Sequence, residues 1–463
     1  MAQDLLPVKE FPKALPLRKL LGPSFILLGL GLGSGEVILW PYLASNFGLG
    51  IIWGAILGLT FQFFMNMEIE RYALSRGESV FVGLSRKLRL LPYWFLISTF
   101  VPWIWPGIAA SSAKFLGSLL GFSQTSNLAI LLLILIGLIL SLGPILYKTV
   151  ERLQKTLIFL GVPTIFILSA VLASRADWQN LFKGIVGLGN DYWLLPAGLP
   201  LASFLAALAY AGAGGNLNLA QSFYVKEKGY GMGKYAGRIT SLLTGRSEKI
   251  SLGGSSFKIN KENLSEFRKW WKNINVEHFL VFWLTGSLTI ALLALLSFST
   301  TYSHAGNLNG IGFVLNEAKE IGLRTFPFFG SFFLLVVGLT LFGTQLTVFD
   351  AVSRILSENI ILSSLGRFKE NHSPRLYYSV LWLQILAGII IFLLGFTEPL
   401  QLLTLAAVLN AFAMFVHTGL TLWLNLSSLE KELRPSFFRI GAMISAFIFY
   451  GGFSLYTLWD RIF

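Results

Sequence analysis

Long apolar stretches recur along almost the whole chain, and they leave few folds open to it. Each is long enough to cross the ~30 Å hydrocarbon core of a bilayer. Only 13% of the 463 residues are charged, whereas a soluble domain carries about 25%. Because backbone polar groups inside a bilayer must be satisfied within the protein, these stretches are expected to be α-helices. The sequence therefore predicts an all-α polytopic membrane protein with eleven spans, at residues 24–46, 50–72, 92–121, 128–147, 153–173, 195–224, 278–299, 326–352, 376–397, 401–424 and 437–458.

Basic residues divide unevenly between the two sides that these spans define. With the N-terminus inside, only six of the 36 lysines and arginines fall on or toward the outside, namely Lys114, Arg175, Lys183, Lys319, Arg324 and Arg461. This bias predicts a cytoplasmic N-terminus and an external C-terminus, in what we expect to be a prokaryotic inner membrane. The net charge of +13 then lies mainly in loops that face anionic lipid. The lipid bilayer, and not nucleic acid, is the expected large partner.

The apolar segments run too continuously for separate soluble domains. We expect a cytoplasmic tail at 1–23, one transmembrane domain at 24–463, repeats at 24–173 and 195–424, and an extra helix at 437–458. A cytoplasmic loop at 225–277 would join the sixth and seventh spans. Within it, Phe267, Trp270 and Trp271 stand among basic residues, a pattern typical of an amphipathic helix at the membrane interface.

The first span combines several glycines with a carboxylate. The segment GLGLGSGEVILWP, residues 29–41, has glycine at four alternate positions and then Glu36. Each glycine weakens a helix by up to ~1 kcal/mol relative to alanine, and a carboxylate at the bilayer centre costs roughly 2.5–3.5 kcal/mol. Both costs are tolerable if the chain unwinds there and lines a cavity for water or substrate. We therefore expect a break at 31–36 that presents Glu36; the structural alternative is a glycine-packed helix with a protonated, hydrogen-bonded Glu36.

A second interruption is expected in the sixth span, which reads LAALAYAGAGGNLNLAQSF. Here Gly212, Gly214 and Gly215 precede Asn216 and Asn218. The first and sixth spans begin two five-span halves, and the second half enters the membrane from the opposite side because five is odd. Inverted repeats whose first helices are both broken at the midplane are typical of secondary transporters. Close helix packing through small residues is the alternative explanation of these glycines.

Three of the predicted spans also carry motifs of a known kind. The first reads LGPSFILLGLGLGSGEVILWP, the eighth LTLFGTQLTVFDA and the tenth LLTLAAVLNAF. They resemble helices one, eight and ten of the Nramp metal-ion transporters. The first helix of that family carries Gly-Pro-Gly-Phe and, eight residues on, Asp-Pro-Gly-Asn. Here the opening motif begins at Gly22, and the second falls on Gly33, Ser34, Gly35 and Glu36. The resemblance implies a leucine-transporter-like fold, with two inverted five-helix repeats and a site between broken helices one and six.

The residues at this expected site depart from the family pattern. The family's sixth helix carries Met-Pro-His-Asn, where this chain has Gly214, Gly215, Asn216 and Leu217, and of the family's charged ligands only a carboxylate remains, at Glu36. Without a thioether the site loses the soft ligand that suits transition metals. Oxygen and amide groups suit a hard cation such as Mg2+, or an organic ammonium or zwitterion. The candidate substrate-binding residues are Gly33, Ser34, Glu36, Gly214, Asn216, Asn218, Gln345 and Asn410, with Thr344 and Thr347 beside them, and the candidate metal ligands are Glu36 and Asn216.

The sequence thus favours a secondary-active or facilitative transporter of a cation, acting as a monomer. The alternative is a carrier of the same fold for a small organic solute such as an amino acid or amine, and a non-transporting membrane receptor is a third class. No nucleophile–base set is visible, so neither an enzyme nor a cofactor is expected. A small polar space around Glu36 would favour the cation, and aromatic walls would favour the organic solute.

Three other features have simpler interpretations. Lys114 is expected to extend its charge toward the membrane surface, and His417 to be a hydrogen-bonded packing residue. Asp350 and Arg354 lie four residues apart on one helix and are expected to pair with each other. In span nine, Gln384 takes the place of the charged residue found in the family.

Overall fold

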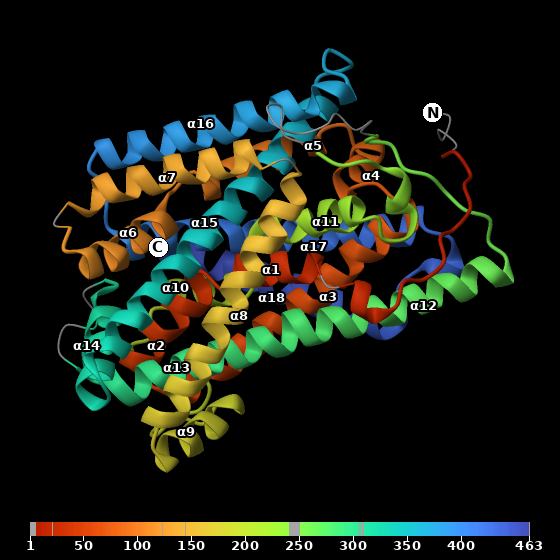
Figure 1. Cartoon of the computed structure of the whole chain (residues 1–463). Helices are drawn as coiled ribbons and strands as arrows, with labels where there is room; N and C mark the ends of the chain where they lie inside the picture. The colour runs from red at the N-terminus through yellow and green to blue at the C-terminus, as the bar shows by residue number, and fades with distance from the viewer. Residues whose placement is uncertain are drawn as a thin grey trace.

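Long helices that run side by side form almost the whole molecule (Figure 1). The computed structural model describes residues 6–20, 22–122, 124–143, 145–239, 251–304, 307 and 310–462. Ten helices within this part of the chain are long and apolar enough to cross a membrane. The chain enters at the right-hand end of Figure 1, and the last helix runs back toward the left-hand end, where the C-terminus lies. The prediction of an all-α membrane protein is confirmed.

The first half of the chain forms five spans, of which the first and third are interrupted. Short helices α4 (Val80–Lys87) and α9 (Arg175–Ile185) lie outside these spans. The spans are α1 (Pro23–Gly31) with a π-helical segment (Ser34–Leu39) and α2 (Trp40–Phe47), then α3 (Ile52–Arg76), α5 (Leu91–Trp103) with α6 (Gly107–Leu120), α7 (Thr125–Leu142) and α8 (Leu146–Leu172).

The second half begins with the sixth span, which is not among the ten long apolar helices because its break leaves two short helices. The short helix α14 (Gly312–Arg324) lies between later spans. The spans are α10 (Leu201–Ala209) with a 3-10 helix (Gly215–Ala220) and α11 (Gln221–Lys228), then α12 (Lys261–His278) with a π-helical segment (Phe279–Leu284) and α13 (Thr285–Thr301), α15 (Pro327–Ser363), α16 (Ser373–Leu393), α17 (Pro399–Ser428) and α18 (Phe437–Ile462).

Two helices extend beyond the predicted spans. The eighth span was expected to end at 352, but α15 continues to Ser363 because charged residues in its last turns are buried and paired inside the protein. The expected amphipathic helix is present at the end of the loop 225–277, and this helix, α12, runs on without a gap into the seventh span. The aromatic face of α12 packs on the N-terminal segment: Trp270 is buried and its ring nitrogen donates to the Pro12 carbonyl over 3.0 Å.

Burial identifies the central spans. The most apolar part of the first span is 100% buried, whereas that of α8 and of α18 is only 28% buried. The outer helices expose large apolar side chains such as Leu131, Phe159 and Leu383, which is how a protein surface meets lipid. The first span therefore crosses the middle of the bundle, where a substrate site would be shielded from lipid.

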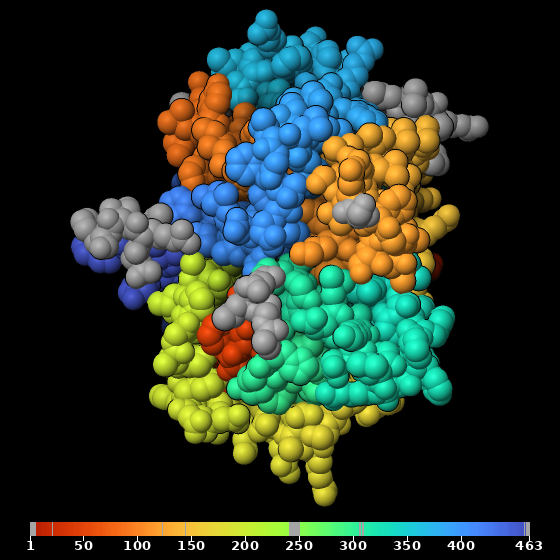
Figure 2. Space-filling model, turned by 90° about the vertical axis from the view of Figure 1, so that its left-hand side faces the viewer, coloured from red at the N-terminus to blue at the C-terminus, as the bar shows by residue number. Residues whose placement is uncertain are grey.

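The first and sixth spans cross each other in opposite directions. In Figure 1 the chain passes leftward from α1 to α2 and rightward from α10 to α11. The α10 helix packs against the π-helical segment of the first span, and α11 packs against α1. The two breaks thus meet near the centre of the bundle. Figure 2 faces the left-hand end, where red atoms of the first span reach the surface between the yellow-green segment and the green one.

The break in the first span is real but shorter than predicted. The regular helix ends at Gly31, and Gly33 has φ −91° and ψ −113°, outside any helical conformation. Ser34 and Glu36 then lie in a wide π-helical turn and not in unwound chain, which corrects the expected range of 31–36.

The break in the sixth span is also present, a little earlier than expected. Residues 210–214 lie outside the helices, and the 3-10 turn after them holds Asn216 and Asn218. Gly214 and Gly215 have φ of +72° and +55°, a left-handed region that side chains with a Cβ rarely adopt. A Cβ on Gly215 would also overlap the side chain of Asn410. Glycine is therefore required at both positions.

Gly35→Ala is expected to lower the melting temperature of the purified protein markedly. A Cβ at position 35 would overlap the backbone carbonyl of Tyr210, which cannot move aside as a side chain would. Overpacking of this kind costs roughly 1–3 kcal/mol. Gly441→Ala in α18 is the matched control, because its Cβ would meet no atom within 4 Å. Equal melting curves for the two variants in detergent would contradict the close approach of the two broken spans.

Candidate functional site

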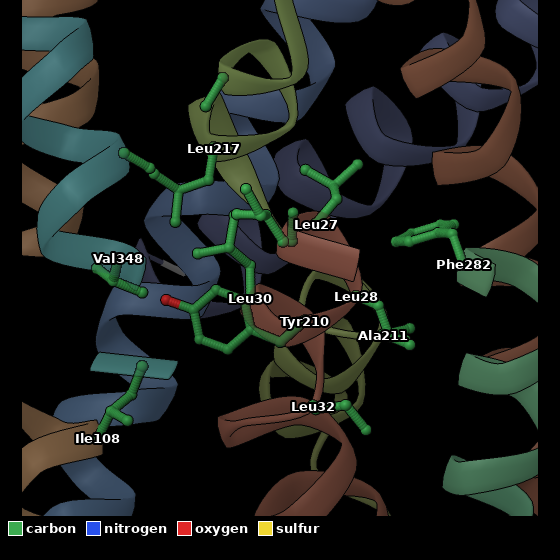
Figure 3. Close-up of a cluster of buried hydrophobic side chains, with 14 of the residues drawn as sticks. Leu27, Leu28, Leu30, Leu32, Ile108, Tyr210, Ala211, Leu217, Phe282 and Val348 are labelled. Carbon is green, nitrogen blue, oxygen red and sulfur yellow. The ribbon is translucent and has the colours of Figure 1, made fainter. Parts of the chain in front are cut away.

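Apolar side chains fill the space between the two breaks (Figure 3). Leu30 of α1, Leu217 of the 3-10 turn and Val348 of α15 lie around the ring of Tyr210, with Ile108 of α6 close by. All of these side chains are buried. The hydroxyl group of Tyr210 points toward the side of Val348 and Ile108. The centre of the molecule thus offers mostly hydrocarbon, with a phenol at its edge.

A second aromatic ring and two amides border this apolar centre. The indole of Trp103 stacks on Tyr210 with ring centroids 5.4 Å apart and planes 22° from parallel. Asn410 of α17 donates from Nδ2 to the Tyr210 hydroxyl over 3.0 Å. Asn216 donates to Ser98 Oγ over 2.8 Å and to the adjacent hydroxyl of Thr99 over 2.9 Å.

The acceptor oxygens of these two amides, Asn216 Oδ1 and Asn410 Oδ1, are buried and lack hydrogen-bond partners in the described part of the chain. Buried polar atoms are rarely left unpaired in proteins. The indole nitrogen of Trp103 is likewise buried and unpaired in this part of the structure. The site therefore presents two acceptors and one donor beside a stacked aromatic pair, and none of these groups is charged.

Other predicted site residues form hydrogen bonds that connect helices. Gln345 accepts from the Ala109 amide over 3.2 Å, and Thr344 donates to the Gly29 carbonyl over 2.8 Å. Gly33 packs directly on the side chain of Thr344. Thr347 accepts from Gln154 over 2.5 Å. These bonds fix α1 and α15 in place.

Two further predicted residues of the sixth span face α3. Asn218 donates to Gln62 Oε1 over 3.0 Å and to Asn66 Oδ1 over 2.7 Å, and the backbone amide of Gly214 donates to Gln62 over 3.3 Å. Sequence reasoning missed Gln62 and Asn66. The signal was present, because polar residues spaced by four along an otherwise apolar span mark one polar helix face.

Glu36 is wholly buried, and neither carboxylate oxygen has a hydrogen-bond partner among the described residues. Its side chain lies between glycines: a methyl group built on Gly31 would be 3.3 Å from Glu36 Oε1, and one built on Gly286 of α13 would be 3.5 Å away. Neither Asn216 nor Asn410 is bonded to it. No cluster of three or more histidine or acidic side chains suited to a metal occurs in the described part of the chain.

At the end of the bundle predicted to be cytoplasmic, ion pairs connect neighbouring spans. The predicted pair of Asp350 and Arg354 is confirmed, with Nε–Oδ1 at 2.9 Å. Arg354 also bonds Glu227 of α11, a partner that sequence reasoning missed. Lys228 of α11 pairs with Glu151 of α8 over 2.8 Å. The α11 half of the sixth span is thus held against two neighbouring spans.

His417 of α17 connects this helix to the break in the sixth span. Its Nε2 is 3.0 Å from the carbonyl oxygen of Gly215, so the prediction of a hydrogen-bonded packing histidine is confirmed. The bond holds α17 against the positive-φ glycines of the break. It thereby supports the position of Asn410, which lies two turns earlier on the same helix.

No family model and no curated protein matches the sequence. Solved structures do match: a mutant of the manganese transporter of Eremococcus coleocola has a TM-score of 0.69 and 14% identity, covering 98% of this chain and 90% of that one. MHP1, a nucleobase-cation-symport-1 transporter solved with bromovinylhydantoin bound, has a TM-score of 0.57 and 10% identity over 98% and 95% of the two chains. MhsT in complex with L-phenylalanine has a TM-score of 0.51 and 14% identity over 94% and 97%.

The chain has the leucine-transporter-like fold. The fold predicted from the Nramp resemblance is therefore confirmed. The solved structures that share it include one named for a metal ion and two named with organic molecules. The fold alone does not distinguish a metal ion from an organic substrate, so the substrate class has to be argued from the side chains at the breaks.

Proposed function

We propose that the protein is a secondary transporter of a small, uncharged organic solute with a planar ring and N–H groups. The observation that carries this proposal is the Trp103–Tyr210 stack beside two unpaired amide oxygens, with no charged group among them. A ring can pack against the aromatic pair, an arrangement worth about 0.5–1.5 kcal/mol beyond the area buried. Its N–H groups can donate to Asn216 and Asn410.

Transport, and not simple binding, is supported by the two broken spans. Antiparallel repeats with both first helices interrupted at the midplane are the architecture of carriers that expose one site to each side in turn. Ion pairs hold α11 to α8 and α15 in this structure. A carrier must be able to close each end separately, and such interhelical pairs are a means to do so.

A divalent cation is less well supported by the same geometry. Mg2+ takes six ligands, mostly oxygen, in a near-octahedral arrangement. The two proposed metal ligands point to different helices: the Asn216 amide bonds α5, while the Glu36 carboxylate lies against Gly286 of α13. We therefore favour the organic solute that the sequence left as the alternative. Benzylhydantoin is the first probe, because a substituted hydantoin, bromovinylhydantoin, is bound in MHP1, and the hydantoin ring carries N–H donors.

Binding of benzylhydantoin is expected to raise the melting temperature of the wild-type protein in detergent, and MnCl2 and MgCl2 are expected to leave it unchanged. Trp103→Ala should raise the benzylhydantoin concentration needed for this stabilisation at least about tenfold, equivalent to ~1.4 kcal/mol of binding. Trp382→Ala is the control, since that indole lies on the surface of α16. Stabilisation by MnCl2 alone, with saturable Mn2+ uptake into proteoliposomes, would overturn the proposal.

A further inference from the structure

One face of α3 carries polar groups deep inside the bundle. Gln62, Asn66 and Glu70 are spaced by four residues, and each is at most 1% exposed. All three meet the broken sixth span, because Gln62 and Asn66 accept from Asn218 while Glu70 accepts from Gln221 Nε2 over 3.4 Å. Four residues of helix advance about 6 Å. The face is therefore a series of polar groups that continues from the level of the break toward the predicted cytoplasmic end.

The series continues beyond α3 into a cluster of titratable groups. Glu70 lies within electrostatic range of Glu277. Ser24 donates from its hydroxyl to Glu277 and lies 2.8 Å from His278 Nδ1. Glu70 Oε1, Glu277 Oε1 and His278 Nε2 are all buried and have no hydrogen-bond partner in the described part of the chain. Glu277 and His278 thus meet at Ser24, Glu70 lies within electrostatic range of Glu277, and each of the three groups has one atom without a partner in this part of the chain.

The other end of the series reaches Glu36 through Gly212. A Cβ on Gly31 would lie 2.9 Å from the Gly212 Cα and 3.3 Å from Glu36 Oε1. A Cβ on Gly212 would overlap the side-chain oxygen Oε1 of Gln62. Glu36 and Gln62 therefore flank the same glycine of the second break. A carboxyl group with no fixed partner begins the series, and a carboxyl and imidazole cluster ends it.

We propose that this series is the route by which a coupling proton passes between Glu36 and the predicted cytoplasmic end. The inference rests on the proposed transport function and adds the ion that drives it. At each transfer an O–H or N–H bond breaks on the group that gives the proton, and one forms on the group that accepts it. Glu36, Glu70, Glu277 and His278 accept and release the proton, and water held by the amides of α3 bridges the ~6 Å steps.

Charged and aromatic side chains surround Glu277 and His278. Glu277 faces lysines from two other spans, and His278 lies within range of one arginine. Phe63 and Phe282 stack on the imidazole with ring centroids 5.6 Å and 4.7 Å away, which fixes its orientation. The titratable and charged groups facing the cluster are Glu70 of α3, Tyr147, Glu151 and Lys155 of α8, Lys228 of α11, Tyr230, and Arg439 of α18.

The decisive experiment compares two kinds of transport in proteoliposomes supplied with benzylhydantoin. An acidic exterior should drive accumulation in the wild type, with internal acidification reported by a pH-sensitive dye. Glu70→Gln and Glu277→Gln should lose the accumulation and the internal acidification. They should keep the exchange of external for internal benzylhydantoin, because exchange needs no net proton movement. Glu317→Gln is the matched control: Glu317 of α14 is also buried with one unpaired oxygen, but it lies outside the series. Accumulation that persists in both variants, or that follows a sodium gradient, would overturn the route and leave the carrier intact.

A measurement without any solute separates this proposal from the transport proposal. Infrared difference spectra of the purified protein, taken between mildly acidic and mildly alkaline pH, should show protonated carboxyl bands that change with pH. Glu70→Gln should remove part of that change. Spectra that do not change with pH would overturn the proton route even if benzylhydantoin is transported. A pH-dependent band lost in Glu70→Gln would support the titrating cluster even if the solute proves to be a different compound.

Discussion

Arg354→Met is expected to prevent recovery of a stable, monodisperse protein from detergent extracts. Arg354 is 1% exposed and bonds Asp350 on its own helix and Glu227 on α11. Tyr377 donates to the same aspartate over 2.9 Å. Removal of the cation leaves two buried carboxylates without their counter-charge, and breaking a buried pair in this way costs about 3–5 kcal/mol. This is a large part of the ~5–15 kcal/mol by which most proteins are stable.

Two further variants show whether the buried network is the cause. Arg324→Met removes a cation of α14 whose pair with Glu320 spans 3.4 Å and whose side chain is 42% exposed; such pairs contribute about 0–1 kcal/mol. Asp350→Asn, Glu227→Gln and Arg354→Met combined should recover much of the lost stability, because no buried charge is then left alone. Equal melting temperatures for the Arg354 and Arg324 variants would show that the network does not hold α11 in place.

The spans and the two breaks could be predicted because they depend on local sequence. Apolar length defines a helix that crosses lipid, and clustered glycines at 29–35 and 212–215 weaken it wherever the surroundings allow. The pair of Asp350 and Arg354 was equally local, since four residues bring two side chains to one helix face. Glu227 could not be added to that pair, because it lies on another helix and no local pattern connects the two.

The positions of side chains around the breaks could not be predicted for a geometric reason. Each helical residue turns the chain by about 100°, so the wide turn at Ser34–Leu39 changes which neighbour Glu36 faces. The sequence placed Glu36 with Asn216 in one ligand set, and the structure directs Glu36 toward α13 and Asn216 toward α5. The same argument applies to Tyr210, whose approach to Trp103 and Asn410 depends on the irregular chain that follows α10.

Glu36→Gln is expected to abolish accumulation of solute against a gradient without lowering the melting temperature. Neither oxygen of Glu36 has a hydrogen-bond partner in the described structure, so the substitution removes no bond that holds the fold. Glutamine has nearly the same volume and avoids the cost of burying a charge. It cannot accept and release a proton, which is the function that the carboxyl group is proposed to have. Pairing of Glu36 with a coupling cation would also be lost, because glutamine carries no negative charge.

The result is read by measuring accumulation, exchange and melting on the same preparation. Accumulation of benzylhydantoin driven by an acidic exterior should fall to the level of vesicles without protein, while exchange and the melting curve stay as in the wild type. Loss of exchange as well would place Glu36 in the solute site and not in the proton route. Normal accumulation with a normal melting curve would show that Glu36 only packs against Gly31 and Gly286. The glycines around it are then explained by close approach of the two broken spans, because Gly35 already lies against the backbone of Tyr210.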